Sequence, residues 1–208
     1  MSDVTLFNAA PLVQLALLAL VLALGPFTWV WLRHRHAEIP LRVRQLTLLT
    51  LFLTFDLVLF GSFTRLTDSG LGCPDWPGCY GHATPLGAHA SIQAAQTAMP
   101  TGPVTWSKAW IEMIHRYLAM GVGVLIIAML VGAWRQWRRT GAPRYAPTVP
   151  ALLLVFVCVQ GAFGAWTVTL KLQPVIVSIH LLLGMSLLAL LSWHAMRQTT
   201  HAPAGPAP

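Results

Sequence analysis

Five long apolar stretches follow one another along the 208-residue chain, and polar segments separate them. Each stretch is long enough to cross the ~30 Å hydrocarbon core of a bilayer as a helix rising about 1.5 Å per residue. The first is too long for the apolar core of a signal peptide, and acidic Asp3 rather than a cation precedes it. The pattern predicts an all-α membrane protein with five transmembrane helices, at residues 11–32, 46–63, 109–134, 149–170 and 175–196.

The spacing of these stretches predicts three parts. Residues 1–44 hold one extra N-terminal transmembrane helix and a basic cytoplasmic loop, and residues 45–197 form a four-helix bundle. Residues 198–208 are rich in Ala and Pro and are expected to be disordered. Within the bundle, the segment 67–108 is much longer than an ordinary connection, so it is either a functional loop or partly disordered.

Composition and charge narrow the class of protein. With 56% hydrophobic and 9% charged residues, the chain is not a water-soluble domain. The net charge of +7 does not indicate nucleic-acid binding, because the basic residues form short clusters between apolar stretches. Nine Lys and Arg residues flank one side of the predicted helices and four flank the other. Since Lys and Arg gather on the cytoplasmic side, we expect a multi-pass protein of the bacterial inner membrane, with the N-terminus and loop 67–108 outside and the C-terminus in the cytoplasm.

Two histidines lie near the outer ends of predicted transmembrane helices. His115 is six residues into its stretch, and His180 follows Pro174, at the outer end of the last stretch, by six residues. At about 1.5 Å per residue, both lie about 9 Å below the helix ends. Two imidazoles at one depth on two helices of a bundle can ligate an iron porphyrin between them. Hydrogen bonds to backbone or hydroxyl groups, another metal and a proton path stay open as alternatives.

Charged residues flank His115 in the sequence E-M-I-H-R. Charges at this depth are costly and usually face a cavity, a partner or a cofactor. Glu112 shares a helix face with His115, so it is a candidate acid, base or electrostatic group beside a ligand. An ion pair with Arg116 is the alternative for Glu112. Arg116 or Arg65 can hold a porphyrin propionate, because guanidinium matches carboxylate geometry. Asp56, deep in the second stretch, either bonds to a neighbouring helix or belongs to a proton relay.

Cysteines and small residues add two further candidate features. Cys73 and Cys79 enclose the compact loop sequence C-P-D-W-P-G-C, whose Pro and Gly residues favour turns. Outside the cytoplasm such a pair can form a disulfide, and two unpaired thiols are the alternative. In the fourth stretch, Gly161, Gly164 and Ala165 either permit close helix packing or leave room for a flat ligand.

Three segments, in this order, resemble the haem A synthase family. They are T-R-L-T-D-S-G-L-G-C-P-D-W-P-G-C-Y-G at 64–81, E-M-I-H-R at 112–116, and the segment 160–180 that begins Q-G and ends at His180. The resemblance covers about residues 46–196. It implies a membrane oxidoreductase of cytochrome oxidase assembly, which oxidises the C8 methyl of haem O by successive hydroxylations to the formyl group of haem A.

The same resemblance implies roles for individual residues. His115 and His180 match the haem-ligating histidines of the family, and Glu112 matches its essential carboxylate. Cys73 and Cys79 match its pair of loop cysteines. Haem O and haem A would be substrate and product, and contact with haem O synthase or with oxidase assembly is expected.

The chain also departs from the family pattern. Members usually carry two similar four-helix halves, the second of which holds a haem b cofactor, whereas this chain resembles the amino-terminal half alone. A homodimer, a separately encoded second half and a truncated copy are the expected explanations. Two other functions stay open, a non-catalytic haem-binding or handover subunit and a membrane thiol oxidoreductase using Cys73 and Cys79. A di-iron site is disfavoured, because only Asp56 and Glu112 lie within the stretches.

Overall fold

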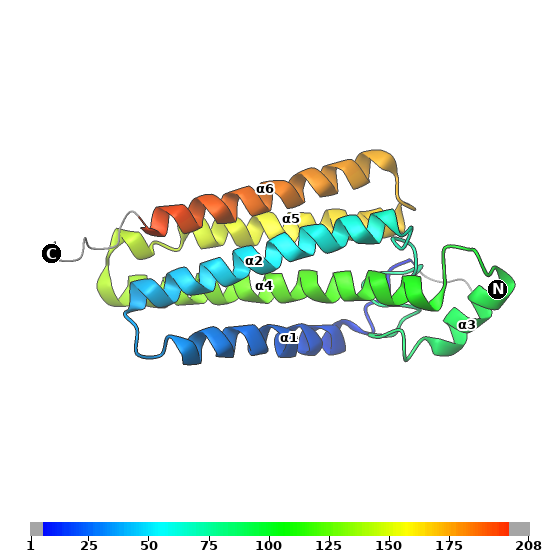
Figure 1. Ribbon diagram of the computed structural model, residues 1–208, viewed down its shortest axis with the longest axis horizontal. Helices are drawn as coiled ribbons and strands as arrows, with labels where there is room; N and C mark the ends of the chain where they lie inside the picture. Colours follow the sequence, from blue (N-terminus) through cyan, green and yellow to red (C-terminus); the bar gives the residue numbers. More distant parts are fainter. Residues whose placement is uncertain (1–5, 200–208) are drawn as a thin grey trace.

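The computed structural model describes residues 6–199, in which five long helices run side by side (Figure 1). Each of the five is long and apolar enough to cross a membrane. This confirms the predicted all-α membrane fold with five transmembrane helices. The helices are α1 (Leu12–Arg33), α2 (Ile39–Leu66), α4 (Trp106–Thr140), α5 (Thr148–Thr169) and α6 (Pro174–Thr199).

Several helices extend beyond the apolar stretches of the sequence, because polar residues continue them at both ends. At the start of α4, the Thr105 side chain accepts a hydrogen bond from the Lys108 backbone N–H at 3.4 Å. The same helix ends at Gly141, which has a φ of 65° that suits a residue without a side chain. Helix α6 continues to Thr199, past residue 198 where the tail is predicted to begin. Residues 200–208 lie outside the described part of the chain.

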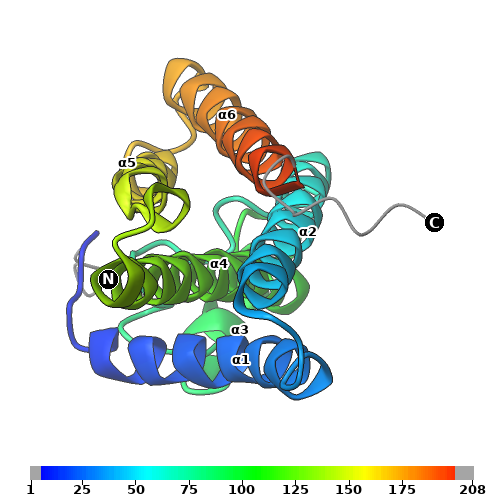
Figure 2. The same cartoon turned by 90° about the vertical axis from the view of Figure 1, so that its left-hand side faces the viewer.

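Four of the long helices form a closed ring. Helix α2 packs against α4 and α6, and α5 packs against the same two helices. Within the described residues, α4 and α6 do not pack against each other, and neither do α2 and α5, so each of these pairs lies on a diagonal of the bundle. Helix α1 lies outside the ring, against α4 and α2, as the end-on view shows (Figure 2). The structure is thus a four-helix bundle with one extra N-terminal helix.

The bundle has different cores at its two ends. Away from the connection between α2 and α4 the core is apolar, with Val122, Ile126, Leu153, Leu187 and Leu191 fully buried or nearly so. The polar residues that α2 buries in this part of the bundle are threonines. Their hydroxyls donate to backbone carbonyls one turn earlier, so each hydroxyl is satisfied without a partner on another helix. These are Thr47, Thr50 and Thr54.

The connection between α2 and α4 is folded at the opposite end of the molecule. It contains the short helix α3 (His89–Ala98), and its buried side chains join those of α1 and α4 in one cluster, with Leu15, Ile92 and Met113 among the members. Phe7 stacks on Trp76 at a centroid distance of 5.8 Å, so the described N-terminal segment lies on this connection as well. Segment 67–108 is therefore folded, which does not fit the expectation of partial disorder, and a function for it stays a prediction.

Candidate functional site

His115 and His180 lie on α4 and α6, one of the two diagonal helix pairs of the bundle. They are close enough that a charge on one imidazole would interact with a charge on the other. Helix α4 begins at Trp106, so His115 is nine residues into its helix, whereas His180 is six residues into α6. The extra residues of α4 extend toward the connection between α2 and α4, and the two imidazoles lie on helices that are diagonal to each other in the bundle.

A glycine on the adjacent helix makes room for each imidazole. A side-chain Cβ at Gly61 of α2 would lie 2.9 Å from Nε2 of His115, closer than real Cβ contacts. A Cβ at Gly164 of α5 would lie 3.2 Å from Cε1 of His180. At Gly161, by contrast, an added Cβ would meet nothing within 4 Å. Sequence reasoning singled out Gly164 but missed Gly61, whose only signal is a lone glycine in an apolar helix.

The donor set fits a porphyrin iron better than a bare metal ion. The described residues contain no cluster of three His, Cys, Asp or Glu side chains that could hold a metal ion. A porphyrin supplies the remaining ligands itself, so two imidazoles suffice. In addition, Nδ1 of His180 is buried and has no hydrogen-bond partner among the residues that the structure describes. A buried unpaired polar atom of this kind calls for an explanation such as a ligand.

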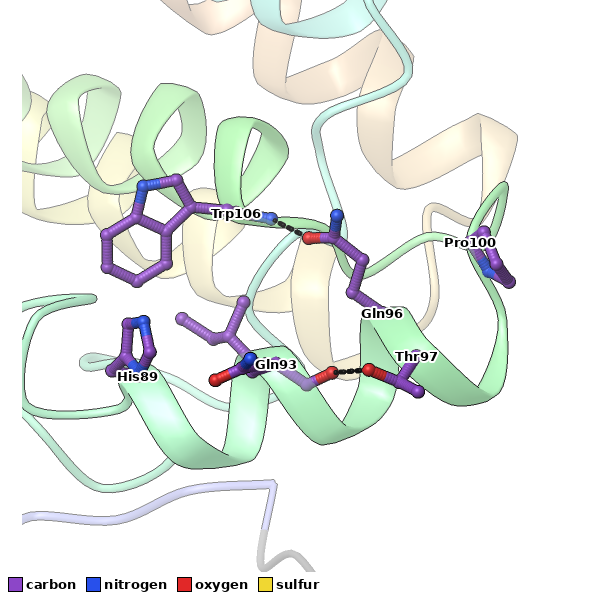
Figure 3. A pocket seen from close by; sticks show the side chains of 7 residues that line it. His89, Gln93, Gln96, Thr97, Pro100 and Trp106 are labelled. Carbon is purple, nitrogen blue, oxygen red and sulfur yellow. Dashed lines mark hydrogen bonds between the residues drawn. The ribbon is translucent and has the colours of Figure 1, made fainter.

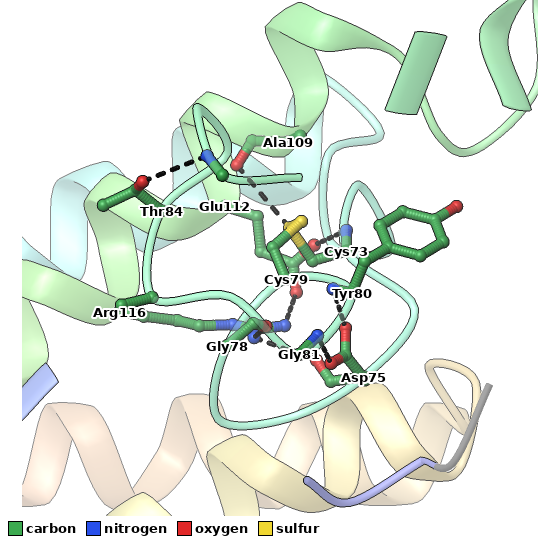
Figure 4. Close-up of a disulfide and its surroundings, with 12 residues drawn as sticks. Cys73, Asp75, Gly78, Cys79, Tyr80, Gly81, Thr84, Ala109, Glu112 and Arg116 are labelled. Atoms are coloured by element: carbon green, nitrogen blue, oxygen red, sulfur yellow. Dashed lines mark hydrogen bonds and ion pairs between the residues drawn. A yellow bond between two sulfur atoms is a disulfide. The ribbon is translucent and has the colours of Figure 1, made fainter. Parts of the chain in front are cut away.

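Glu112 faces the outer loop (Figure 4). Its carboxylate is almost fully buried, at 4% exposure. One oxygen accepts a hydrogen bond from the backbone N–H of Cys73 at 2.7 Å, and the other forms a short ion pair with the Arg116 guanidinium. Glu112 therefore has two strong partners, and these differ from the neighbours of His115. The ion pair considered for Glu112 is present, while its predicted chemical role stays a prediction.

Arg116 joins α4 to the disulfide loop. Its Nη1 atom lies within hydrogen-bonding distance of three carbonyls of this loop, while Nη2 pairs with Glu112. A guanidinium presents several N–H groups in a fixed fork and can satisfy such an arrangement, which a Lys ammonium cannot reproduce. The predicted propionate role of Arg116 is not tested by these contacts, but they occupy much of its donor capacity. The three carbonyls are those of Asp75, Pro77 and Gly78.

A disulfide between Cys73 and Cys79 closes the loop, and both cysteines are 0% exposed. Inside the loop the Asp75 carboxylate accepts hydrogen bonds from the backbone N–H groups of Tyr80 and Gly81, at 2.6 and 2.7 Å. Burial raises the pKa of the Tyr80 phenol, and the negative charge of Asp75 raises it further. The structure thus contains the bonded alternative for the cysteine pair, in a loop held by internal hydrogen bonds.

Arg65, the second predicted propionate partner, is exposed in the last turn of α2. Close by, the Lys108 ammonium lies 2.8 Å from the Asp68 carboxylate. The hydrogen bond from Lys108, followed by its charge, holds the pKa of Asp68 below the ordinary value. Positive and negative groups thus alternate at this edge of the bundle, beside the disulfide loop.

A hollow in the connection between α2 and α4 lies beside α3 and has a volume of about 420 Å³ (Figure 3). Gln96 accepts a hydrogen bond from the backbone N–H of Trp106 there, at 2.9 Å. None of the residues predicted to carry chemistry lines this hollow. It is lined by His89, Ile92, Gln93, Gln96, Thr97, Pro100 and Trp106.

Comparisons with known proteins agree with the resemblance seen in the sequence. Residues 44–207 match the model of a family described as "Cytochrome oxidase assembly protein". A "Heme A synthase" of Shewanella oneidensis is 46% identical over 144 residues, which cover 69% of this chain and 42% of that protein. A "Heme A synthase" of Novosphingobium aromaticivorans is 30% identical over 165 residues, covering 70% of this chain and 46% of the relative. No solved structure matches.

A relative with a different name is also similar. A "Protoheme IX farnesyltransferase" of Halobacterium salinarum is 29% identical over 153 residues, covering 72% of this chain and 30% of that protein. In each of these three comparisons, the chain spans less than half the length of the relative.

Proposed function

The chain belongs to the cytochrome oxidase assembly protein family, and from this premise we propose that it acts in haem A synthesis, with haem O as its substrate. The reaction proposed is oxidation of the C8 methyl of haem O to a formyl group. The observation that carries the proposal is the placement of His115 and His180 on diagonal helices of the bundle, each beside a glycine of an adjacent helix.

In this proposal His115 and His180 hold the iron of haem O from α4 and α6. The bundle supplies an apolar surrounding that excludes water from the reacting methyl group. Bound haem iron supplies the redox chemistry, and the protein supplies binding, orientation and electrostatics. Arg65, which is exposed at the outer end of α2, is the more accessible of the two predicted propionate partners.

Glu112 is proposed as the group that stabilises positive charge or moves a proton beside the substrate. Glu112 is buried and precedes His115 by three residues in the sequence. Both facts support this role, because a partly desolvated carboxylate can be tuned for proton transfer. The bonds of Glu112 to Arg116 and Cys73 also orient its carboxylate. A change in the loop would then change the position of the proposed catalytic group.

A second four-helix unit is part of the proposal. The relatives are more than twice as long as the region they share with this chain, which leaves room for another half. We propose that a second copy of the chain, a separately encoded chain or a continuation of this one supplies that half, with haem b as its cofactor. The proposed orientation places the disulfide loop outside the cytoplasm and the C-terminus inside.

Two alternatives are distinguishable from this function. A haem-handover subunit would bind haem O without converting it, and the length of the relatives keeps this reading open. A thiol oxidoreductase would need an accessible cysteine pair, whereas Cys73 and Cys79 are fully buried. Burial of the disulfide therefore favours a structural role for it over thiol exchange.

Haem extraction tests the proposal. The chain is produced in cells that make haem O, purified in detergent, and its haems are extracted and separated by chromatography. Haem A in the extract of the wild-type protein, and its loss in His115→Ala and His180→Ala, is the expected result. His194→Ala is the matched control, since His194 lies at the inner end of α6 and bonds to Gln198 instead. Haem O without haem A would support the handover subunit, and a haem-free wild-type protein would overturn both readings.

A further inference from the structure

Helix α5 presents two residues to His180, and they are four positions apart on one helix face. Gly164 lies against the ring, since a Cβ there would be 3.2 Å from Cε1. Gln160 lies against the backbone, where its Nε2 donates to the His180 carbonyl oxygen at 3.0 Å. Gly184, one turn further along α6, makes this contact possible, because a Cβ at that position would lie 3.1 Å from Nε2 of Gln160. The imidazole and its backbone are thus both positioned from α5.

The contact with the backbone fixes which way the Gln160 amide points. A carbonyl oxygen can only accept, so the amide nitrogen must face His180 and Oε1 must point elsewhere. Oε1 is buried and has no hydrogen-bond partner within residues 6–199. Nδ1 of His180 also has no hydrogen-bond partner of ordinary length and angle there, although the backbone of Gln160 lies near the same imidazole. Two unpaired polar atoms therefore belong to two residues that are already bonded to each other.

We infer that Gln160 is a positioning residue for His180, and that its Oε1 accepts the proton of Nδ1 when Nε2 of His180 ligates haem. This inference rests on the proposed function, because it concerns a ligating imidazole. An imidazole that binds a metal through one nitrogen carries its proton on the other, which becomes an obligatory donor. Metal-bound histidines almost always donate that N–H to a nearby acceptor, which fixes the ring and raises its basicity. A bond between Oε1 and Nδ1 satisfies both buried atoms at once.

The variants Gln160→Leu and Gln160→Glu separate this role from plain packing. Leu keeps the bulk of the side chain but has no acceptor, whereas Glu keeps the size and an acceptor oxygen in either protonation state. Gln198→Leu is the matched control: Gln198 also makes a bond between helices, from Nε2 to the Thr47 hydroxyl at 3.1 Å, but at the inner end of the bundle. Each protein is purified with bound haem O. The haem reduction potential and the rate of haem transfer to a scavenging apoglobin are then measured.

Gln160→Leu is expected to lose haem faster by about 10–100-fold, the range usual for removal of a partner behind a metal ligand. Its haem potential is expected to move in the positive direction, since the imidazole becomes a weaker donor to iron. Gln160→Glu is expected to keep the wild-type potential or to move it in the negative direction. Gln198→Leu is expected to match the wild-type protein in both measurements.

The outcomes are separable. If the wild-type chain holds haem O and Gln160→Leu matches it in potential and haem loss, the inference is overturned while the proposed function stands. The same holds if Glu and Leu shift the potential together, since that would indicate a packing effect. If the wild-type chain binds no haem O, the proposed function falls, and this inference falls with it.

Discussion

Neighbouring residues of α4 contact two different regions of the molecule, the disulfide loop and the interior of the helix bundle. Glu112 and Arg116 form an ion pair with each other and hydrogen bonds to the disulfide loop. His115, which lies between them in sequence, instead lies beside Gly61 of α2 and comes near His180. Part of the helix is bonded to the loop, and His115 is packed against Gly61 of a neighbouring helix. Within one short motif, Glu112 and Arg116 thus hold the loop, and His115 is the proposed haem ligand.

The chemistry of the side chains explains this division. Charged groups are costly to remove from water, so the burial of a carboxylate and a guanidinium near a membrane requires several strong partners. An imidazole can be neutral and is satisfied by fewer contacts, which leaves a nitrogen available to a metal. Arg116 is therefore expected to act mainly on stability, while His115 acts mainly on ligand binding. Substitutions that affect one property without the other test this contrast.

Arg116→Ala is expected to have the largest effect, and to act on stability. The change leaves the Glu112 carboxylate buried without its ion pair and the loop carbonyls without their donor. Breaking a buried pair by removing one partner costs about 3–5 kcal/mol of unfolding free energy. Thermal unfolding in detergent, with proteolysis of the outer loop as a second readout, measures the loss. The control is Arg138→Ala, an exposed arginine in the last turn of the same helix.

An unfolding midpoint of Arg116→Ala equal to that of Arg138→Ala would contradict the structural role. The loop would then not depend on the contacts that Arg116 makes. Arg116→Lys is expected to fall between wild type and Arg116→Ala, since a point charge restores the ion pair but not the fork of donors.

Gly61→Ala is expected to act in the opposite way, weakening haem binding while leaving stability intact. The added methyl would lie 2.9 Å from Nε2 of His115 and must displace that end of the imidazole. The helix itself gains, because Ala is the better helix former by roughly 0.5–1 kcal/mol. Haem affinity, measured by titration of the haem-free chain, is expected to fall about tenfold, at the lower end of the effect of changes behind a metal ligand.

Gly123→Ala on α4 is the control for this change, since an added Cβ there meets nothing within 4 Å. It is expected to keep wild-type haem affinity. Equal affinity in Gly61→Ala and Gly123→Ala would show that the space beside His115 does not matter for the ligand.

The smallest expected effect concerns the exposed Asp68–Lys108 ion pair at the edge of the loop side. Lys108 lowers the pKa of Asp68 in the folded protein, so the pair stabilises the fold at pH values above the ordinary aspartate pKa of about 4. This contribution is lost as the pH falls through the lowered folded-state pKa. Asp68→Asn is therefore expected to lower the unfolding midpoint slightly at neutral pH and not at all in acid. A difference from wild type that grows as the pH falls would contradict the ion pair.

The sequence was sufficient to predict the helices, because long apolar stretches specify membrane spans directly. It also placed His115 and His180 on two helices of one bundle, and their role as a ligand pair stays a prediction. The disulfide was one of two alternatives from spacing alone, and the loop sequence 64–81 added the resemblance that pointed to a cysteine pair.

Other parts of the site could not be predicted, because they depend on contacts between distant segments. Arg116 bonds to carbonyls about forty positions away in sequence, and no periodicity along α4 reveals such partners. The same is true of Gly61, which matters only because His115 from another helix lies beside it. The bond from Gln160 to the His180 carbonyl likewise depends on the register between α5 and α6.

Electron paramagnetic resonance of the ferric, haem O-loaded chain tests most directly whether His115 and His180 form the ligand pair. The wild-type protein is expected to show a low-spin signal of the kind given by two imidazole ligands. His115→Ala and His180→Ala are each expected to lose that signal, while Arg116→Lys and His194→Ala keep it. A low-spin signal that survives in both single histidine variants would contradict the assignment of His115 and His180 as the haem ligands.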